Sequence, residues 1–152
     1  MSNPDHEMVP HLVVSNASAA IEFYKKGLGF EELSRMPTPD GKILHSTLMR
    51  GGNKIFVCDV FPNMGPGGCR DPQDLGGSSV TIHLGSSDVD AEFAKAVAAG
   101  AKATMPPQDM FWGSRFAKIV DPFGHHWSLS THQRDVSPEE AKRAADAIFK
   151  KK

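Results

Sequence analysis

The sequence predicts an α+β fold in which two copies of a βαβββ module follow one another. Three observations predict it: the same order of elements occurs twice, matching landmarks recur after a nearly constant interval, and a stretch rich in glycine and proline separates the two halves. The interval is 70, 71 and 72 residues in the pairs Glu22-Phe23 and Glu92-Phe93, Gly29 and Gly100, and Gly52 and Gly124. A near-constant interval is typical of an internal duplication, and the matched element order favours duplication over chance.

The first module is predicted over residues 8–61. It begins with a strand at Val9–Val14 and continues with a helix at about Ala17–Leu28. The apolar residues of this helix recur with helical spacing and share one face, and Gly29 is well placed to end it. Three further strands are expected at Glu31–Ser34, Lys42–Met49 and Lys54–Phe61.

The second module is predicted over residues 79–131 with the same order of elements. Asp88 can cap its helix, which runs from about Val89 to Ala99. The strand after this helix is expected to end at Met105, before Pro106-Pro107. The other strands are expected at Ser79–Leu84, Arg115–Val120 and Gly124–Thr131.

Two further segments complete the expected organisation. Residues 62–78 hold too many glycines and prolines for regular structure, and we interpret them as a linker or a lid. Residues 136–150 contain Ser137-Pro138-Glu139-Glu140, a capping box with proline at the first helical position. This sequence predicts an extra C-terminal helix packed outside the two modules.

Composition narrows the class of function. The chain has 152 residues, enough for one ordinary domain, and 17 basic residues against 18 acidic ones. This balance argues against a nucleic-acid surface and a polybasic membrane anchor. The apolar stretches are too short to span a bilayer, and the first residues do not resemble a signal sequence, so we expect a cytoplasmic protein. Cys58 and Cys69 match no metal-binding spacing and are expected to be reduced.

Four stretches of the chain resemble the vicinal oxygen chelate superfamily, the glyoxalase, bleomycin-resistance and extradiol-dioxygenase group. They are Leu12–Tyr24, Gly27–Phe30, Ala98–Ala101 and Asp121–Trp127. The segment Phe111–Phe116 is similar to the PhnB-like branch of that superfamily. The resemblance implies that the two modules form an open barrel-like sheet with helices outside and a small-molecule cavity within. It also implies a homodimer.

The resemblance implies a metal site that this chain lacks in its usual form. Metal-using members hold a divalent ion with four inward residues, commonly histidine or glutamine and glutamate, and these positions fall at Val9, Phe56, Thr81 and Ser128. Such an ion needs imidazole or carboxylate donors, so no cofactor is expected. Two residues further along each strand, a second set could hold a metal at a non-standard site or could line a pocket: His11, Cys58, His83 and Ser130. We favour lining, because no carboxylate joins this set.

Eight residues are expected to line a ligand pocket. In this interpretation Trp112 forms an aromatic wall and Arg115 an anion clamp near the mouth. Alternation along the last strand turns His126 and Ser128 inward, and Trp127 and Leu129 toward a helix. The complete set is His11, His45, Phe56, His83, Trp112, Arg115, His126 and Ser128.

Two functions compete on this basis. The first is a protein that encloses a small organic molecule without chemistry. The second is an enzyme of lyase, isomerase or dioxygenase type that uses the non-standard metal site or a histidine base. A scaffold without a ligand is disfavoured, because so many polar residues do not suit a plain core. Besides its ligand, the expected partner is a second copy of the chain, with no nucleic acid or membrane.

Overall fold

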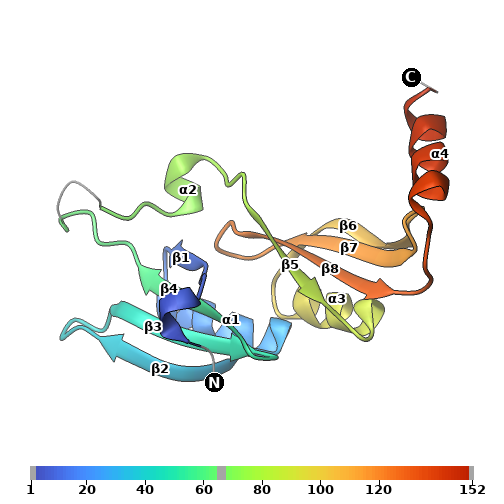
Figure 1. The fold of residues 1–152 in the computed structure, drawn as a ribbon. Coiled ribbons are helices and arrows are strands. Elements are labelled where there is room, and N and C mark those ends of the chain that lie inside the picture. Colours follow the sequence, from blue (N-terminus) through green and yellow to red (C-terminus); the bar gives the residue numbers. More distant parts are fainter. Residues whose placement is uncertain (1–2, 65–67, 151–152) are drawn as a thin grey trace.

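The computed structural model describes residues 3–64 and 68–150 and contains two βαβββ modules (Figure 1). The first forms a sheet in the order β1-β4-β3-β2 and the second a sheet in the order β5-β8-β7-β6. In both sheets the first strand of the module runs parallel to the last, and the other pairs are antiparallel. The predicted fold class is therefore confirmed, and the two sheets do not close into a barrel.

The elements of the first module are β1 (His11–Val14), α1 (Ala17–Leu28), β2 (Glu31–Pro37), β3 (Ile43–Arg50) and β4 (Asn53–Asp59).

The elements of the second module are β5 (Thr81–Gly85), α3 (Val89–Ala98), β6 (Lys102–Asp109), β7 (Ser114–Val120) and β8 (His126–His132).

Outside the modules lie a short 3-10 helix at Pro4–His6, α2 (Pro72–Leu75) in the segment between the modules, and α4 (Pro138–Phe149). No helix in the described ranges is long and apolar enough to cross a membrane.

Both modules start their helix in the same way, as expected for a duplication. The side chains of Asn16 and Asp88 accept hydrogen bonds from the backbone of the first helical turn. The last strand of each module adds a second acceptor: Asp59 Oδ1 lies 2.8 Å from the Ala17 nitrogen, and Thr131 Oγ1 lies 3.0 Å from the Val89 nitrogen. The end of each sheet thus fixes the start of its helix.

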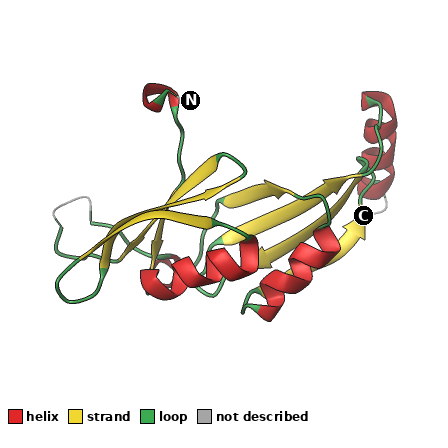
Figure 2. Cartoon of the chain, turned by 90° about the horizontal axis from the view of Figure 1, so that it is seen from below, coloured by secondary structure: helices red, strands yellow, loops and turns green. Residues whose placement is uncertain are grey.

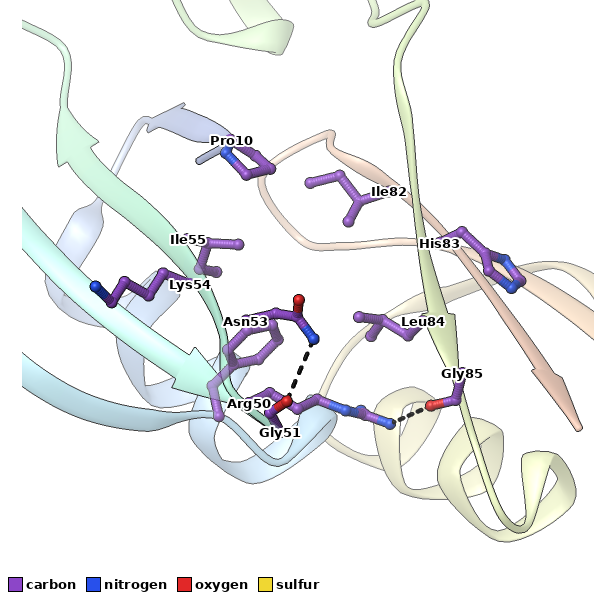
Figure 3. A pocket seen from close by; sticks show the side chains of 11 residues that line it. Pro10, Arg50, Gly51, Asn53, Lys54, Ile55, Ile82, His83, Leu84 and Gly85 are labelled. Carbon is purple, nitrogen blue, oxygen red and sulfur yellow. Dashed lines mark hydrogen bonds between the residues drawn. The ribbon is translucent and has the colours of Figure 1, made fainter. Parts of the chain in front are cut away.

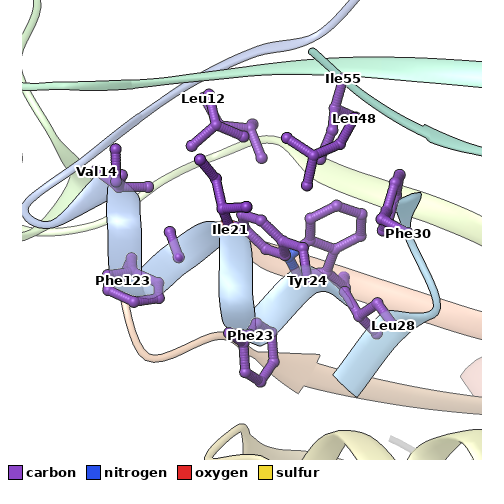
Figure 4. Close-up of a cluster of buried hydrophobic side chains, with 14 of the residues drawn as sticks. Leu12, Val14, Ile21, Phe23, Tyr24, Leu28, Phe30, Leu48, Ile55 and Phe123 are labelled. Carbon is purple, nitrogen blue, oxygen red and sulfur yellow. The ribbon is translucent and has the colours of Figure 1, made fainter. Parts of the chain in front are cut away.

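The two helices lie side by side and cover the same side of the molecule (Figure 2). Each sheet therefore has one face packed on a helix and another that points away from it, which we call its open face. Alternation decides which side chains reach which face: on β1, Leu12 and Val14 are buried, whereas His11 and Val13 are not. The buried residues join one apolar cluster that runs through both modules (Figure 4).

A buried carboxylate joins the two modules. Asp121, in the turn before β8, is 3 % exposed and accepts a hydrogen bond of 2.6 Å from the Tyr24 hydroxyl of α1. The same oxygen accepts one of 2.9 Å from Trp127 Nε1, and the other oxygen binds the backbone nitrogens of Phe123 and His125 at 2.9 and 3.0 Å. Burial, with the adjacent carboxylate, raises the pKa of Tyr24 well above its ordinary value.

A second connection runs through Arg50 at the end of β3. Its guanidinium donates to the Leu28 carbonyl at 2.6 Å, to the Gly85 carbonyl at 3.1 Å and to Glu92 Oε1 at 2.9 Å. One side chain therefore binds the end of α1, the end of β5 and helix α3. Together with Asp121 it holds the modules edge to edge, so that both open faces lie on the side away from the helices.

The structure corrects three expectations. Strand β6 continues through Pro106-Pro107 to Asp109, because it is an edge strand and bulges at the prolines, where Met105 pairs with Lys118 and Gln108 with Phe116. The segment between the modules contains one regular element, the short helix α2, although residues 65–67 lie outside the described ranges. Helix α4 forms as predicted, but none of its described residues is buried, and it projects from the second module (Figure 1).

Candidate functional site

The open face of the second sheet carries a row of polar side chains at its centre. His83 on β5, Ser128 on β8 and Lys118 on β7 are neighbours in the strand register and point to the same side. Their neighbours along the chain, Ile82, Trp127 and Ile119, turn toward the apolar cluster. The row is therefore a consequence of strand alternation in three adjacent strands.

His83 is fixed in orientation while remaining exposed. Its Nδ1 lies 2.7 Å from Ser128 Oγ and its Nε2 lies 3.0 Å from Ser130 Oγ. The ring is nearly parallel to that of Phe116, with 6.1 Å between centroids. Since both nitrogens are hydrogen-bonded within the chain, the imidazole is held in one orientation on an exposed surface.

Aromatic rings extend this face toward one end of the sheet. Trp112 packs edge to face on Phe116, with 5.7 Å between centroids, and is 39 % exposed. Gly113 makes this placement possible with a φ of +94°, which other residues rarely adopt. The predicted aromatic wall at Trp112 thus lies in line with Phe116 and His83.

The open face of the first sheet carries an equivalent row with different chemistry. His11, Phe56 and Thr47 occupy the register positions that His83, Ser128 and Lys118 occupy in the second sheet. His45 joins them, with its ring centroid 4.6 Å from that of Phe56 and 5.9 Å from that of His11. Burial, and to a lesser degree the neighbouring His45, lowers the pKa of His11. The two rows therefore share a histidine at the same position, but the row of the first sheet is largely aromatic and that of the second sheet is polar.

A cleft separates the two sheets next to these rows. One hollow of about 460 Å³ has Phe30, Ile55 and Leu84 among its apolar residues and His83 and Arg50 among its polar ones (Figure 3). Its volume lies within the range of small-molecule sites.

A second hollow of about 290 Å³ includes His11 and His126. Because Pro10 and Ile82 line both hollows, the two adjoin.

The structure groups seven of the eight expected lining residues in three places. His83, Ser128 and Trp112 belong to the second open face, and His11, His45 and Phe56 to the first. His126 borders the hollow that also contains His11. His11 and His126 thus border one hollow from both modules, whereas the ring of His83 points away from Ile82 and Leu84, the apolar residues of the other (Figure 3).

Arg115 lies apart from these groups. Its Nε and Nη2 donate to the two carboxylate oxygens of Asp90 on α3 at 2.7 and 2.9 Å, and its Nη1 donates to Asp109 at 3.0 Å. These hydrogen bonds raise the pKa of Arg115 further above its ordinary value. The guanidinium of Arg115, which was expected to bind an anionic ligand, is therefore already paired with two carboxylates of the chain.

Sequence reasoning missed Lys118 and Phe116 as members of the site. The signal was present, because Ala117 and Ile119 are the apolar partners of an alternating pattern that turns Phe116 and Lys118 the other way. The same alternation placed Ser130 in the second set of possible metal ligands, and in the structure its hydroxyl forms a hydrogen bond with His83.

The residues at the family's metal positions do not fit a divalent ion. Phe56 and Val9 offer only hydrocarbon, Thr81 and Ser128 offer hydroxyls, and Ser128 is already bonded to His83. We therefore derive no step through such an ion.

The second set of possible metal ligands is divided between two sheets, with His11 and Cys58 on the first and His83 and Ser130 on the second. Burial, with Cys69 close by, raises the pKa of Cys58 to about 11, which disfavours the thiolate that binds metals. Among the described residues no three side chains of histidine, cysteine, aspartate or glutamate form a metal-binding group. The donors of this set therefore do not suit a metal ion, and whether they line a pocket stays a prediction.

Comparison with known proteins agrees with this fold. The sequence model of the Glyoxalase/Bleomycin resistance protein/Dioxygenase superfamily matches residues 4–129. The chain belongs to this superfamily. Its members are often metal-dependent, whereas the residues of this chain at the metal positions are poor ligands.

Three similar proteins illustrate the relationship. An uncharacterised protein of Mycobacterium tuberculosis, Rv0887c, is 44 % identical over 142 residues, covering 93 % of this chain and 84 % of that protein. The crystal structure of TioX from Micromonospora sp. ML1 is 30 % identical with a TM-score of 0.64 and covers 83 % of this chain and 98 % of that one. A Bacillus cereus structure described as a PhnB protein and putative 3-demethylubiquinone-9 3-methyltransferase is 17 % identical, with a TM-score of 0.62 over 83 % of this chain and 99 % of that one. It agrees with the PhnB-like resemblance at the level of the fold.

Proposed function

We propose that this protein binds a small organic molecule on the open face of its second sheet, beside the cleft between the modules. One observation carries the proposal: His83 is exposed, yet both of its ring nitrogens are held by serine hydroxyls. An exposed side chain normally keeps its rotamer freedom, so an ordered polar row on an open surface is typical of a preorganised binding site.

Binding should require His83 but folding should not. In His83→Ala we expect the dissociation constant for the fluorescent probe N-phenyl-1-naphthylamine to rise at least tenfold, about 1.4 kcal/mol. The free energy of unfolding should change by less than about 1 kcal/mol, because water can replace the lost bonds to the exposed ring. Fluorescence titration and urea denaturation measure the two quantities.

His6→Ala, a change in the exposed 3-10 helix, is the matched control. A marked loss of stability in His83→Ala with unchanged probe binding would show that His83 is a structural residue and not a binding one.

We further propose that a second copy of the chain covers the open faces. Both faces lie on the side of the molecule away from α1 and α3, and α2 borders only part of the first, where Pro72 and Leu75 line a hollow together with His11 and Val13. The first face presents Phe56, Val13 and Met36, of which Met36 is 56 % exposed. A two-fold axis brings the same surface of each copy into contact, so each copy can cover the other's exposed apolar groups.

The expected particle in solution is a homodimer with twice the 16.5 kDa mass of the chain. Multi-angle light scattering at micromolar concentration measures this mass directly. Met36→Glu places a charge on the open face and should shift the population toward monomer, whereas Val97→Glu on helix α3, on the opposite side of the molecule, should not. A monomer in the unmodified protein at this concentration would refute the assembly.

An enzyme remains the second candidate, and one observation favours it. Ser130 Oγ lies within hydrogen-bond distance of His83 Nε2, as a hydroxyl must for a histidine base to take its proton. This function differs from binding alone in that the ligand would be recovered chemically changed, which mass spectrometry of a bound ligand after prolonged incubation detects.

A further inference from the structure

Lys118 is a half-buried cation without a partner. It sits at the centre of the second open face, and in the described part of the chain its ammonium group makes no hydrogen bond or ion pair. Lys54, on the equivalent face of the first module, is instead paired with Glu7 at 2.8 Å. Keeping a charge partly out of water without a partner is unfavourable, so such a group suits a site where the partner is supplied by a ligand.

The strand residues that share the second open face with Lys118 supply no negative charge. Three register rows cross the second open face, and none of their residues is an aspartate or glutamate. Lys102, in the row beside Lys118, is the other charged residue among them. The rows are Thr81, His126, Val120 and Lys102; His83, Ser128, Lys118 and Met105; and Gly85, Ser130, Phe116 and Gln108.

The serines next to Lys118 have a proton to donate. In neutral His83 one ring nitrogen donates and the other accepts, so one serine receives a hydrogen bond from the ring and the other gives one to it. The serine that receives keeps its own hydroxyl proton, and among the described residues this proton has no acceptor. Whichever tautomer His83 adopts, one hydroxyl donor therefore remains for a ligand acceptor beside the lysine.

The same face offers flat apolar contact at a short distance. Phe116 lies in the row next to Ser128 and Lys118, and Trp112 packs on its ring. A ligand with its head at Lys118 can thus place an aromatic or apolar body against Phe116 and Trp112. This combination of a cation, a hydroxyl donor and ring surface selects for charge at one end of the ligand only.

On the basis of the proposed function, we infer that the ligand is an organic anion whose carboxylate or sulfonate head binds Lys118 and a serine hydroxyl and whose aromatic body packs on Phe116 and Trp112. Lys118 therefore determines specificity for charge. Arg115, the residue from which sequence reasoning expected an anion clamp, does not take part because Asp90 and Asp109 occupy it.

Two fluorescent probes separate the charge from the apolar body. The first, 1-anilinonaphthalene-8-sulfonate, and the second, N-phenyl-1-naphthylamine, share the same ring system, and only the first carries a sulfonate. In Lys118→Met we expect the dissociation constant of the sulfonate probe to rise about tenfold, because a hydrogen bond to a charged group is lost, and that of the neutral probe to change less than twofold. Lys118→Arg should keep the sulfonate affinity within about threefold, because the charge remains.

Lys95→Met, on an exposed position of α3, is the control and should leave both probes unaffected. Circular dichroism verifies that each variant is folded. If Lys118→Met weakens the two probes equally or weakens neither, while His83→Ala still weakens both, the inference about charge is overturned and the binding site stands. If His83→Ala weakens neither probe, the proposed function itself fails.

Discussion

Asp121→Asn is expected to lower the free energy of unfolding by about 3 kcal/mol. The buried carboxylate accepts four hydrogen bonds, and the substitution replaces one of its two accepting oxygens by an amide nitrogen, which can only donate. One carboxylate oxygen accepts from Tyr24 and Trp127, and the other from two backbone nitrogens. An asparagine must turn its amide nitrogen toward one of these pairs of donors. Urea denaturation followed by circular dichroism measures the loss.

Asp146→Asn provides a matched control, because Asp146 makes an ion pair with Lys142 on the surface of α4. Pairs of this kind contribute about 0.3–0.5 kcal/mol, so this variant should remain close to the unmodified protein. Tyr24→Phe removes one of the four hydrogen bonds to Asp121, so its free energy of unfolding should lie between those of Asp121→Asn and Asp146→Asn. Equal stability of Asp121→Asn and the control would show that the junction does not depend on the carboxylate.

The duplicated architecture could be predicted because its signals are local. Asn16 and Asp88 mark the starts of α1 and α3, and Gly29 marks the end of the first, so both helices were placed to within one residue. The prolines of β6 were misread because a diproline usually ends a strand, and whether a strand lies at the edge of a sheet depends on the whole sheet.

The site could be predicted only in part. Strand alternation identifies the face that His83 and Ser128 share, since the period of two is encoded in neighbouring residues. The partners of Arg115 lie 25 and 6 residues away along the chain, and the hydroxyl of Tyr24 meets Asp121 over a separation of 97 residues. No local pattern specifies such pairs, which depend on how the two modules and their helices meet.

The divergence of the two rows gives the duplication a functional meaning. Phe56 and Thr47 in the first module stand where Ser128 and Lys118 stand in the second, while His11 and His83 are the same residue type. In the assembly we propose, an aromatic face of one copy can lie opposite a polar, cationic face of the other. A ligand held between them would meet apolar surface on one side and hydrogen-bond donors on the other.

Gly113→Ala is expected to lower the free energy of unfolding by about 3 kcal/mol, because the backbone there is left-handed and has no room for a methyl group. A Cβ at this position would lie 2.2 Å from the Arg134 carbonyl oxygen and 3.0 Å from Val136 Cγ2. The Gly113 carbonyl also accepts hydrogen bonds from the backbone nitrogens of Gln133 and Arg134 at 2.9 and 3.1 Å. Relieving the contact must therefore separate the two segments and break these bonds.

Gly52→Ala isolates the steric part of this effect. Gly52 also has a positive φ, +81°, but nothing lies within 4 Å of its added Cβ, so only the conformational cost of about 1 kcal/mol applies. The Gly113 variant should also displace Trp112 from Phe116, and acrylamide should then quench tryptophan fluorescence more strongly than in the Gly52 variant. Equal losses of stability in the two variants would contradict the close approach of Gly113 to Arg134, and with it the support that this turn gives to the aromatic wall.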